Sequence, residues 1–97
     1  MIENKIMVDL ENKMNKFIDK KVIVIQDGFV QNRLIIQNLK YCLKGQILNI
    51  TDNESSNYIK FNLNQVYRIE NDEEKMKFYL DNDLNISIKS GLTNSIK

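Results

Sequence analysis

Residues 76–89, "MKFYLDNDLNISIK", decide the fold of this chain, because they hold two alternating stretches on either side of a short polar turn. Every second residue in each half is apolar, which is typical of a strand with one buried face. Asn82 and Asp83 tolerate the left-handed backbone that a tight turn requires. We therefore predict an antiparallel hairpin whose pairs are Leu80 with Leu84, Phe78 with Ile86, and Met76 with Ile88.

The same alternation continues toward the N-terminus and predicts more strands. Polar segments such as "TDNESSN" (51–57) and "ENDEEK" (70–75) separate them. Each predicted hairpin keeps its apolar residues on one side, as a fixed register requires. We expect a four-stranded meander whose further pairs are Ile50 with Ile59, Leu48 with Phe61, Ile69 with Met76, and Tyr67 with Phe78.

The first residues show a helical period in place of the alternation. Asp9 and Lys13 form a favourable pair four positions apart, and no glycine or proline interrupts the segment. Its mixed-sign polar face favours packing on a sheet over lying on a membrane. The predicted apolar face consists of Ile2, Ile6, Leu10, Met14, Phe17 and Ile18.

Residues 22–45 carry a less regular pattern. The run from Val22 to Ile25 is apolar throughout, as expected for a strand that is covered on both faces. Asp27 and Gly28 suit a two-residue hairpin turn. The alternation changes phase at Gly45, so we expect a bulge or sharp bend there.

Together these patterns predict one α+β domain over residues 1–97, because a chain of this length buries enough surface for a single core. An N-terminal helix is followed by a bent antiparallel sheet or a small barrel of five to six strands. The expected elements are a helix at about 2–19 and strands at about 21–26, 29–37, 39–51, 58–69, 75–80 and 84–89.

The order of these segments resembles that of Sm-like and SH3-like small barrels. A helix precedes "KKVIVIQDG" (20–28), and "GQILNI" (45–50), "YIKFNL" (58–63) and "QVYRIEN" (65–71) follow. The resemblance implies a small barrel, and it makes homo-oligomers and RNA binding the alternatives to consider. Residues 29–38, "FVQNRLIIQN", lack the glycine and Asp of the first Sm-like motif, and Ile69 follows Arg68 where the second motif has glycine. No RNA-binding residue is therefore carried over from the family.

Composition argues against catalysis. The chain has no histidine, so it lacks the side chain that most often transfers protons near neutral pH. Cys42 is the only cysteine, it has no histidine to activate it as a nucleophile, and the chain has too few cysteine and histidine ligands for a zinc site. We predict no enzyme, no catalytic residue, no metal and no cofactor. A single cysteine and the absence of a long apolar run favour a cytoplasmic protein that does not enter membranes.

One face of the predicted meander combines cations with tyrosines, while the acids collect in the turns. Lysine and arginine bind phosphate while tyrosine stacks on unpaired bases, as in single-stranded nucleic-acid binding. Tyrosine and arginine also anchor protein interfaces. The third interpretation is a solvated sheet face. The predicted partner-binding residues are Tyr58, Lys60, Asn62, Arg68, Lys77, Tyr79 and Lys89.

The favoured function is binding to a protein partner without catalysis. The net charge of +1 makes the chain neither a polycation for duplex DNA nor a polyanion that mimics it. Asn, Ile and Lys dominate while Ala and Pro are absent, which suggests an AT-rich genome. We therefore expect a small modulator or inhibitor of a host complex, encoded by a phage or mobile element. An Sm-like protein that binds single-stranded RNA or DNA is the alternative.

Overall fold

The structure is a computed structural model that describes residues 4–90. One α-helix, α1 (Asn4–Met14), continues into a short 3-10 helix, η1 (Asn15–Phe17), and a second such turn, η2 (Leu63–Gln65), lies between two strands. The strands are β1 (Val22–Asp27), β2 (Gln31–Ile36), β3 (Leu39–Lys44), β4 (Ile47–Asp52), β5 (Tyr58–Asn62), β6 (Val66–Asn71), β7 (Lys75–Leu80) and β8 (Asn85–Lys89).

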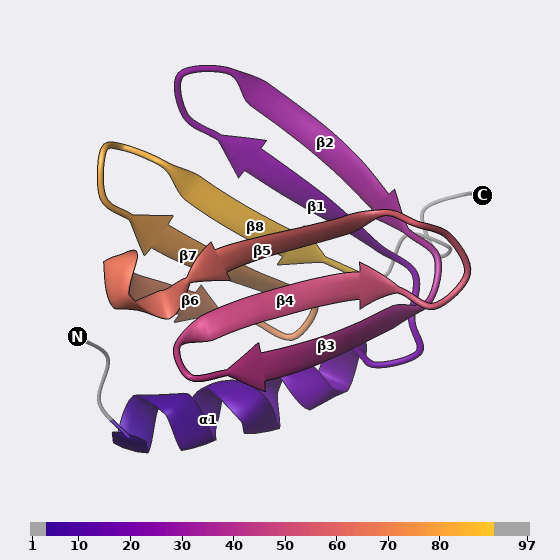
Figure 1. Cartoon of the computed structure of the whole chain (residues 1–97), viewed down its shortest axis with the longest axis horizontal. Helices are drawn as coiled ribbons and strands as arrows, with labels where there is room; N and C mark the ends of the chain where they lie inside the picture. Colours follow the sequence, from indigo (N-terminus) through magenta and orange to yellow (C-terminus); the bar gives the residue numbers. More distant parts are fainter. Residues whose placement is uncertain (1–3, 91–97) are drawn as a thin grey trace.

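The strands form two antiparallel sheets that enclose one core (Figure 1). The larger sheet has the order β2-β1-β8-β7-β6 and the smaller sheet the order β3-β4-β5. In Figure 1 the smaller sheet lies in front of the larger one, and α1 runs along the β3 side. The α+β class with an N-terminal helix is confirmed. Within residues 4–90 the sheets do not close into a barrel, so the expected small barrel is not found.

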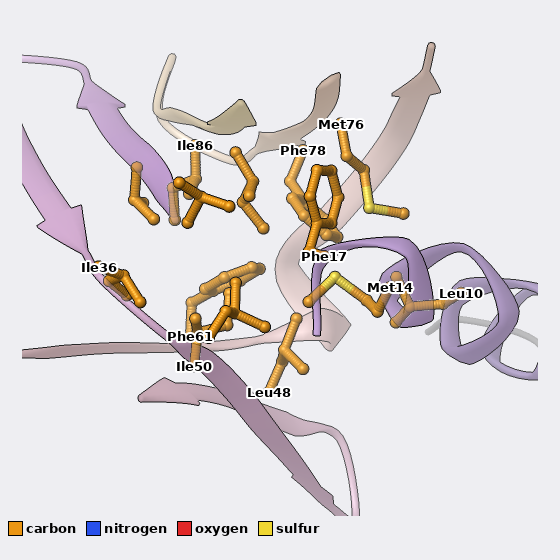
Figure 2. Packing of buried hydrophobic residues seen from close by; sticks show 14 of the residues in the cluster. Leu10, Met14, Phe17, Ile36, Leu48, Ile50, Phe61, Met76, Phe78 and Ile86 are labelled. Atoms are coloured by element: carbon orange, nitrogen blue, oxygen red, sulfur yellow. The ribbon is translucent and has the colours of Figure 1, made fainter. Parts of the chain in front are cut away.

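The core lies between the sheets and is entirely apolar at its centre. Phe61 of β5 meets Phe78 of β7 edge to face, with ring centroids 5.0 Å apart, which is a favoured aromatic geometry. Figure 2 shows side chains from both sheets and from the helix meeting around this pair. The buried residues are Leu10, Met14, Phe17, Val22, Val24, Ile36, Leu39, Leu48, Ile50, Phe61, Leu63, Met76, Phe78, Leu80, Ile86 and Ile88.

The N-terminal helix is part of this core. Leu10, Met14 and Phe17 are buried and enter it from one side (Figure 2), as the helical period predicts. The predicted pair of Asp9 and Lys13 is present, with an oxygen-to-nitrogen distance of 2.9 Å. Ile2 lies outside the described residues, and the side chain of Ile6 is not described. The helical segment ends at Phe17 rather than near 19, because Ile18 is extended and the next residue has a positive φ of 64°.

Two of the three predicted registers are confirmed, and the third is wrong. Phe78 pairs with Ile86 between β7 and β8, and the pairs between β4 and β5 are also those expected. Asn82 and Asp83 have φ values of 66° and 60°, as predicted for this turn. Ile69 of β6, however, pairs with Phe78 rather than with Met76, because β6 continues to Asn71 and the turn to β7 is shorter than expected; a β-bulge at Tyr67 then shifts the register once more between Arg68 and Val66.

The two longest predicted strands are each two strands, so the structure has more strands than the five to six expected. Residues 39–51 form a hairpin of β3 and β4, in which Gly45 adopts a φ of 60° at the turn. Residues 58–69 contain η2, where the chain leaves the smaller sheet at β5 and enters the larger sheet at β6. The expected continuous meander is therefore divided between the two sheets.

The first hairpin differs in its turn. Asp27 pairs with Gln31, so three residues, Gly28 to Val30, lie between β1 and β2 instead of the expected two-residue turn. Along its other edge β1 pairs with β8, so the first and the last described strands in chain order are neighbours in the sheet. Phe29 at this hairpin tip is 104% exposed. The predicted strand at 29–37 accordingly starts later, at Gln31.

The buried carboxylate of Asp52 joins two loops, although its place in a polar segment predicted a solvated turn residue. It accepts hydrogen bonds from the backbone N–H groups of Gln37, Asn38 and Glu54, each at 3.0 Å, and from the Ser55 hydroxyl at 2.8 Å. Burial alone would raise the pKa of Asp52, but these donors stabilise the charged form and lower its pKa to about 2. The carboxylate thus holds the β2–β3 connection against the β4–β5 turn.

Candidate binding site

The structure separates the predicted partner-binding residues into two groups on different sheets. Tyr58, Lys60 and Asn62 belong to β5 in the smaller sheet, where they alternate with the inward-facing Ile59 and Phe61. The other group, which belongs to the larger sheet, consists of Arg68, Lys77, Tyr79 and Lys89. The division follows from η2, where the chain passes from one sheet to the other.

The outer face of the larger sheet is fixed by the burial of its alternate residues. Met76, Phe78 and Leu80 of β7 face the core, so Lys77 and Tyr79 point to the opposite side. Pairing then places β8 and β6 side chains beside them on this outer face, in the pairs Tyr79 with Asn85, Lys77 with Ser87, Tyr79 with Arg68, and Lys77 with Glu70.

The β-bulge adds a second tyrosine to this face. Val66 and Ile69 both pack against the core although they are three positions apart, so a residue between them falls out of the alternation. That residue is Tyr67, whose side chain is 69% exposed. Its ring centroid is 6.3 Å from that of Tyr79. The prediction that Tyr67 faces the core opposite Phe78 is therefore wrong.

Glu70 organises the side chains around Tyr79. Its two carboxylate oxygens accept a hydrogen bond from the Tyr79 hydroxyl at 2.8 Å and from an Arg68 guanidinium nitrogen at 2.6 Å. The Arg68 guanidinium carbon lies 5.2 Å from the Tyr79 ring centroid, and the Lys77 ammonium lies 4.9 Å from it. We call Tyr67, Arg68, Glu70, Lys77 and Tyr79 the tyrosine cluster. The prediction that this face carries no acid is wrong, because β6 continues to Asn71 and ordinary alternation then places Glu70 on the same face as Arg68.

The tyrosine cluster combines exposure with order. Tyrosine has only two side-chain torsions to restrict, and the hydroxyl of Tyr79 is already held by Glu70. Cations stacked on an exposed ring gain about 0.5–1 kcal/mol each, which further restricts Arg68 and Lys77. The cluster thus presents two exposed rings, inclined at 46° to each other, whose polar groups are arranged before any partner arrives. Such an arrangement suits recognition, because less freedom is lost when a partner binds.

The remaining predicted residues have other surroundings. Asn62 caps η2, since its side-chain oxygen accepts a hydrogen bond from the Asn64 N–H at 2.8 Å. Tyr58 is exposed on the smaller sheet, away from the tyrosine cluster. Tyr67 and Glu70 are the two cluster residues that the alternation missed. The spacing of Val66 and Ile69 is the signal that identifies Tyr67, because two core residues three apart in one strand require a bulge, whereas Glu70 is missed because β6 continues into the polar segment.

Comparisons of the chain with protein-family models, with curated proteins and with solved structures gave no match. In the part of the chain that the structure describes, His, Cys, Asp and Glu side chains form no group of three suited to a metal ion. The helices described there are too short or too polar to span a bilayer. Cys42 is a free, exposed thiol on β3.

Proposed function

We propose that this chain is a non-catalytic binding protein that recognises another protein through the tyrosine cluster. The observation that carries the proposal is the preorganised pair of Tyr67 and Tyr79, flanked by Arg68 and ordered by Glu70. Tyrosine and arginine are enriched among the residues that dominate the energy of protein interfaces. β-bulges are frequent at sheet edges and beside functional sites, where they redirect a side chain, and here the bulge brings Tyr67 out of the core next to Tyr79.

Glu70 favours a protein partner over single-stranded nucleic acid. A strand whose bases stack on Tyr67 and Tyr79 brings its phosphates close to this carboxylate, which repels them. Arg68, the cation nearest to the ring of Tyr79 besides Lys77, is already paired with Glu70. A protein surface has no such conflict, because its backbone and hydroxyl groups can bond to both the acid and the arginine.

The test compares two tyrosines of the cluster with one on the other sheet. Tyr67→Ala and Tyr79→Ala should each weaken binding to the native protein partner by about 30-fold, which corresponds to about 2 kcal/mol for a dominant interface residue. Tyr58→Ala is the matched control, because Tyr58 is also exposed but lies on the smaller sheet. It should bind as the wild type does.

The partner is first isolated on the immobilised chain from cells that encode it, and affinities are then measured by calorimetry with the purified partner. Thermal unfolding of each variant verifies that its fold is intact. Wild-type affinity in the double variant of Tyr67 and Tyr79 would contradict the proposal. So would tight binding of single-stranded DNA or RNA, with a log–log salt slope of about −0.7 per phosphate contact, that depends on the same two tyrosines.

A further inference from the structure

A row of four side chains crosses the outer face of the larger sheet beside the tyrosine cluster. The strand registers place Ile35 of β2, Ile23 of β1, Lys89 of β8 and Lys75 of β7 next to one another in this order. All four point away from the core, because their neighbours along each strand are the buried or half-buried inner residues. We call these four residues the outer row.

The two lysines of the outer row are placed in an unfavourable way for an isolated protein. Lys75 and Lys89 are direct cross-strand partners, and like charges in this position destabilise a sheet. The ion pairs among residues 4–90 are Asp9–Lys13, Asp19–Lys40 and Arg68–Glu70, and none of them involves either lysine. An anion from outside the described chain would relieve this repulsion.

A hollow of about 380 Å³ lies next to Lys75, and its other lining residues are Glu70, Asn71, Asp72 and Lys77. Both carboxylates in this lining already accept hydrogen bonds. Glu70 accepts from Tyr79 and Arg68, and one Asp72 oxygen accepts from the backbone N–H of the following residue at 2.9 Å. The ammonium groups of Lys75 and Lys77 are therefore the cationic donors that the hollow offers to a ligand, beside the side-chain amide of Asn71.

The other half of the outer row is apolar. Ile35 is 43% exposed, and Ile23 is half-buried between its neighbours on β2 and β8. Two isoleucines next to two lysines match a ligand that carries apolar groups at one end and anionic groups at the other. The row crosses four adjacent strands, a distance of about 14–15 Å, which an extended peptide of about five residues covers.

We propose that the outer row docks an acidic, partly apolar segment of the protein partner, with its carboxylates on Lys75 and Lys89 and its apolar side chains on Ile23 and Ile35. This inference rests on the proposed function, since it places the same partner on the neighbouring part of the same face. Charge complementarity gives the orientation of the segment across the strands. Lys77 of the tyrosine cluster lies two positions from Lys75 on the same face of β7 and makes the two surfaces continuous.

A polypeptide fits this surface better than a nucleic acid does. The basic patch is short, because Glu70, Asp72, Glu73 and Glu74 border it at the β6–β7 turn. A nucleic-acid strand carries a phosphate on every nucleotide, so a strand that continues past the lysines in that direction meets these acids. A peptide can confine its carboxylates to the two positions that face the lysines.

The experiment uses an acetylated, amidated hexapeptide of sequence Leu-Ser-Leu-Glu-Ser-Glu as probe for the full chain, followed by backbone amide NMR shifts. We expect saturable shifts centred on Ile23, Lys75 and Lys89. A peptide with serine in place of both leucines should bind at least threefold more weakly, because it lacks the apolar contact. Hexathymidylate is the nucleic-acid probe, and it should bind this face more weakly than the first peptide.

The matched control removes the same number of positive charges from the smaller sheet as the test variant removes from the larger sheet. The double variant Lys75→Gln with Lys89→Gln should lose at least fivefold in peptide affinity, whereas Lys44→Gln with Lys60→Gln, on the outer face of the smaller sheet, should retain it. Equal affinity in the two double variants, an absence of saturable shifts at the row, or tighter binding of hexathymidylate there would overturn the inference. If the peptide causes no shifts at the outer row while the tyrosine variants still lose affinity for the native partner, this inference fails and the proposed function stands. The two failures are therefore distinguishable.

Discussion

Replacing Leu10 with alanine tests whether α1 belongs to the fold or is an appendage that waits for a partner. The Leu10 side chain is 1% exposed and belongs to the same buried cluster as Met14 and Phe17. Leu-to-Ala changes at buried sites cost about 2.7–5.0 kcal/mol, and we expect about 3 kcal/mol here. A chain of 97 residues has a total stability of about 5–15 kcal/mol, so this loss is a large share of it.

The expected effect is large enough to measure by heat and by denaturant. With about 2.1 cal/mol/K per residue, the unfolding entropy of 97 residues is about 0.2 kcal/mol/K, so the loss lowers Tm by about 15 °C. In urea the midpoint should fall while the slope m stays the same, because the surface exposed on unfolding hardly changes. Circular dichroism reports both transitions.

Asn12→Ala is the control, because Asn12 is exposed on the same helix and its replacement should change the stability by no more than about 0.5 kcal/mol. Equal stability of the Leu10 and Asn12 variants would refute the reasoning. So would a chain without residues 1–18 that still unfolds cooperatively with the wild-type midpoint. In either case the helix would not be needed for the sheets to fold.

Three further outcomes follow from single residues. The pKa of Asp52 is lowered to about 2 from its ordinary value of 3.8, so its stabilising effect is complete above pH 4 and is lost as the pH falls toward 2. Urea titrations of the wild type at several pH values should show this loss of stability. The stability of Asp52→Asn should depend less on pH. Gly45→Ala should cost about 1–2 kcal/mol, because φ is 60° and no atom lies near enough to clash, whereas Gly45→Asn should cost less; equal costs would contradict a backbone origin. Cys42→Ser should change the stability by less than about 0.5 kcal/mol and leave partner binding intact, since the thiol is exposed; loss of binding with the fold preserved would assign Cys42 a role.

The parts of the fold that the sequence predicts correctly depend on short turns between regular strands. Leu80 and Leu84 are separated by three residues, so alternation on both sides leaves one register that buries both apolar sets. Residues 48–50 and 59–61 pair as predicted for the same reason, with a buried face in each strand. The helix is equally local, because its period alone identifies Leu10, Met14 and Phe17 as core residues.

The errors arise where the chain changes direction without changing its pattern. Phe61 and Leu63 are both buried two residues apart, as in a continuous strand, yet a 3-10 turn lies between them and β6. The alternation therefore predicts that Tyr58, Lys60 and Asn62 lie on the same sheet face as Arg68, Lys77 and Tyr79. Those latter three could be placed together, because β6, β7 and β8 follow one another in the same sheet.

The sequence pattern does not predict the hydrogen bonds of the candidate site. The alternation assigns a residue to one of two faces, but a bulge reverses that assignment for every residue before it. Alternation therefore places Tyr67 in the core, and the polar run at 70–75 places Glu70 in a turn, whereas β6 continues to Asn71 and Glu70 accepts a hydrogen bond from the Tyr79 hydroxyl. Asp52 was misread for a different reason, because its donors come from a distant connection that only the packed structure brings near.

The position of β8 has a consequence for how the protein is made. This strand is the last of the described strands in chain order, yet it lies between β1 and β7 in the larger sheet. Until β8 has left the ribosome, the β1–β2 hairpin and the β6–β7 hairpin have no strand to join them. Each then exposes an unpaired edge and an apolar face, which are the features that promote aggregation of nascent chains. Cooperative folding of the larger sheet therefore waits until β8 has emerged, and the cell must keep the partly folded polypeptide soluble until then.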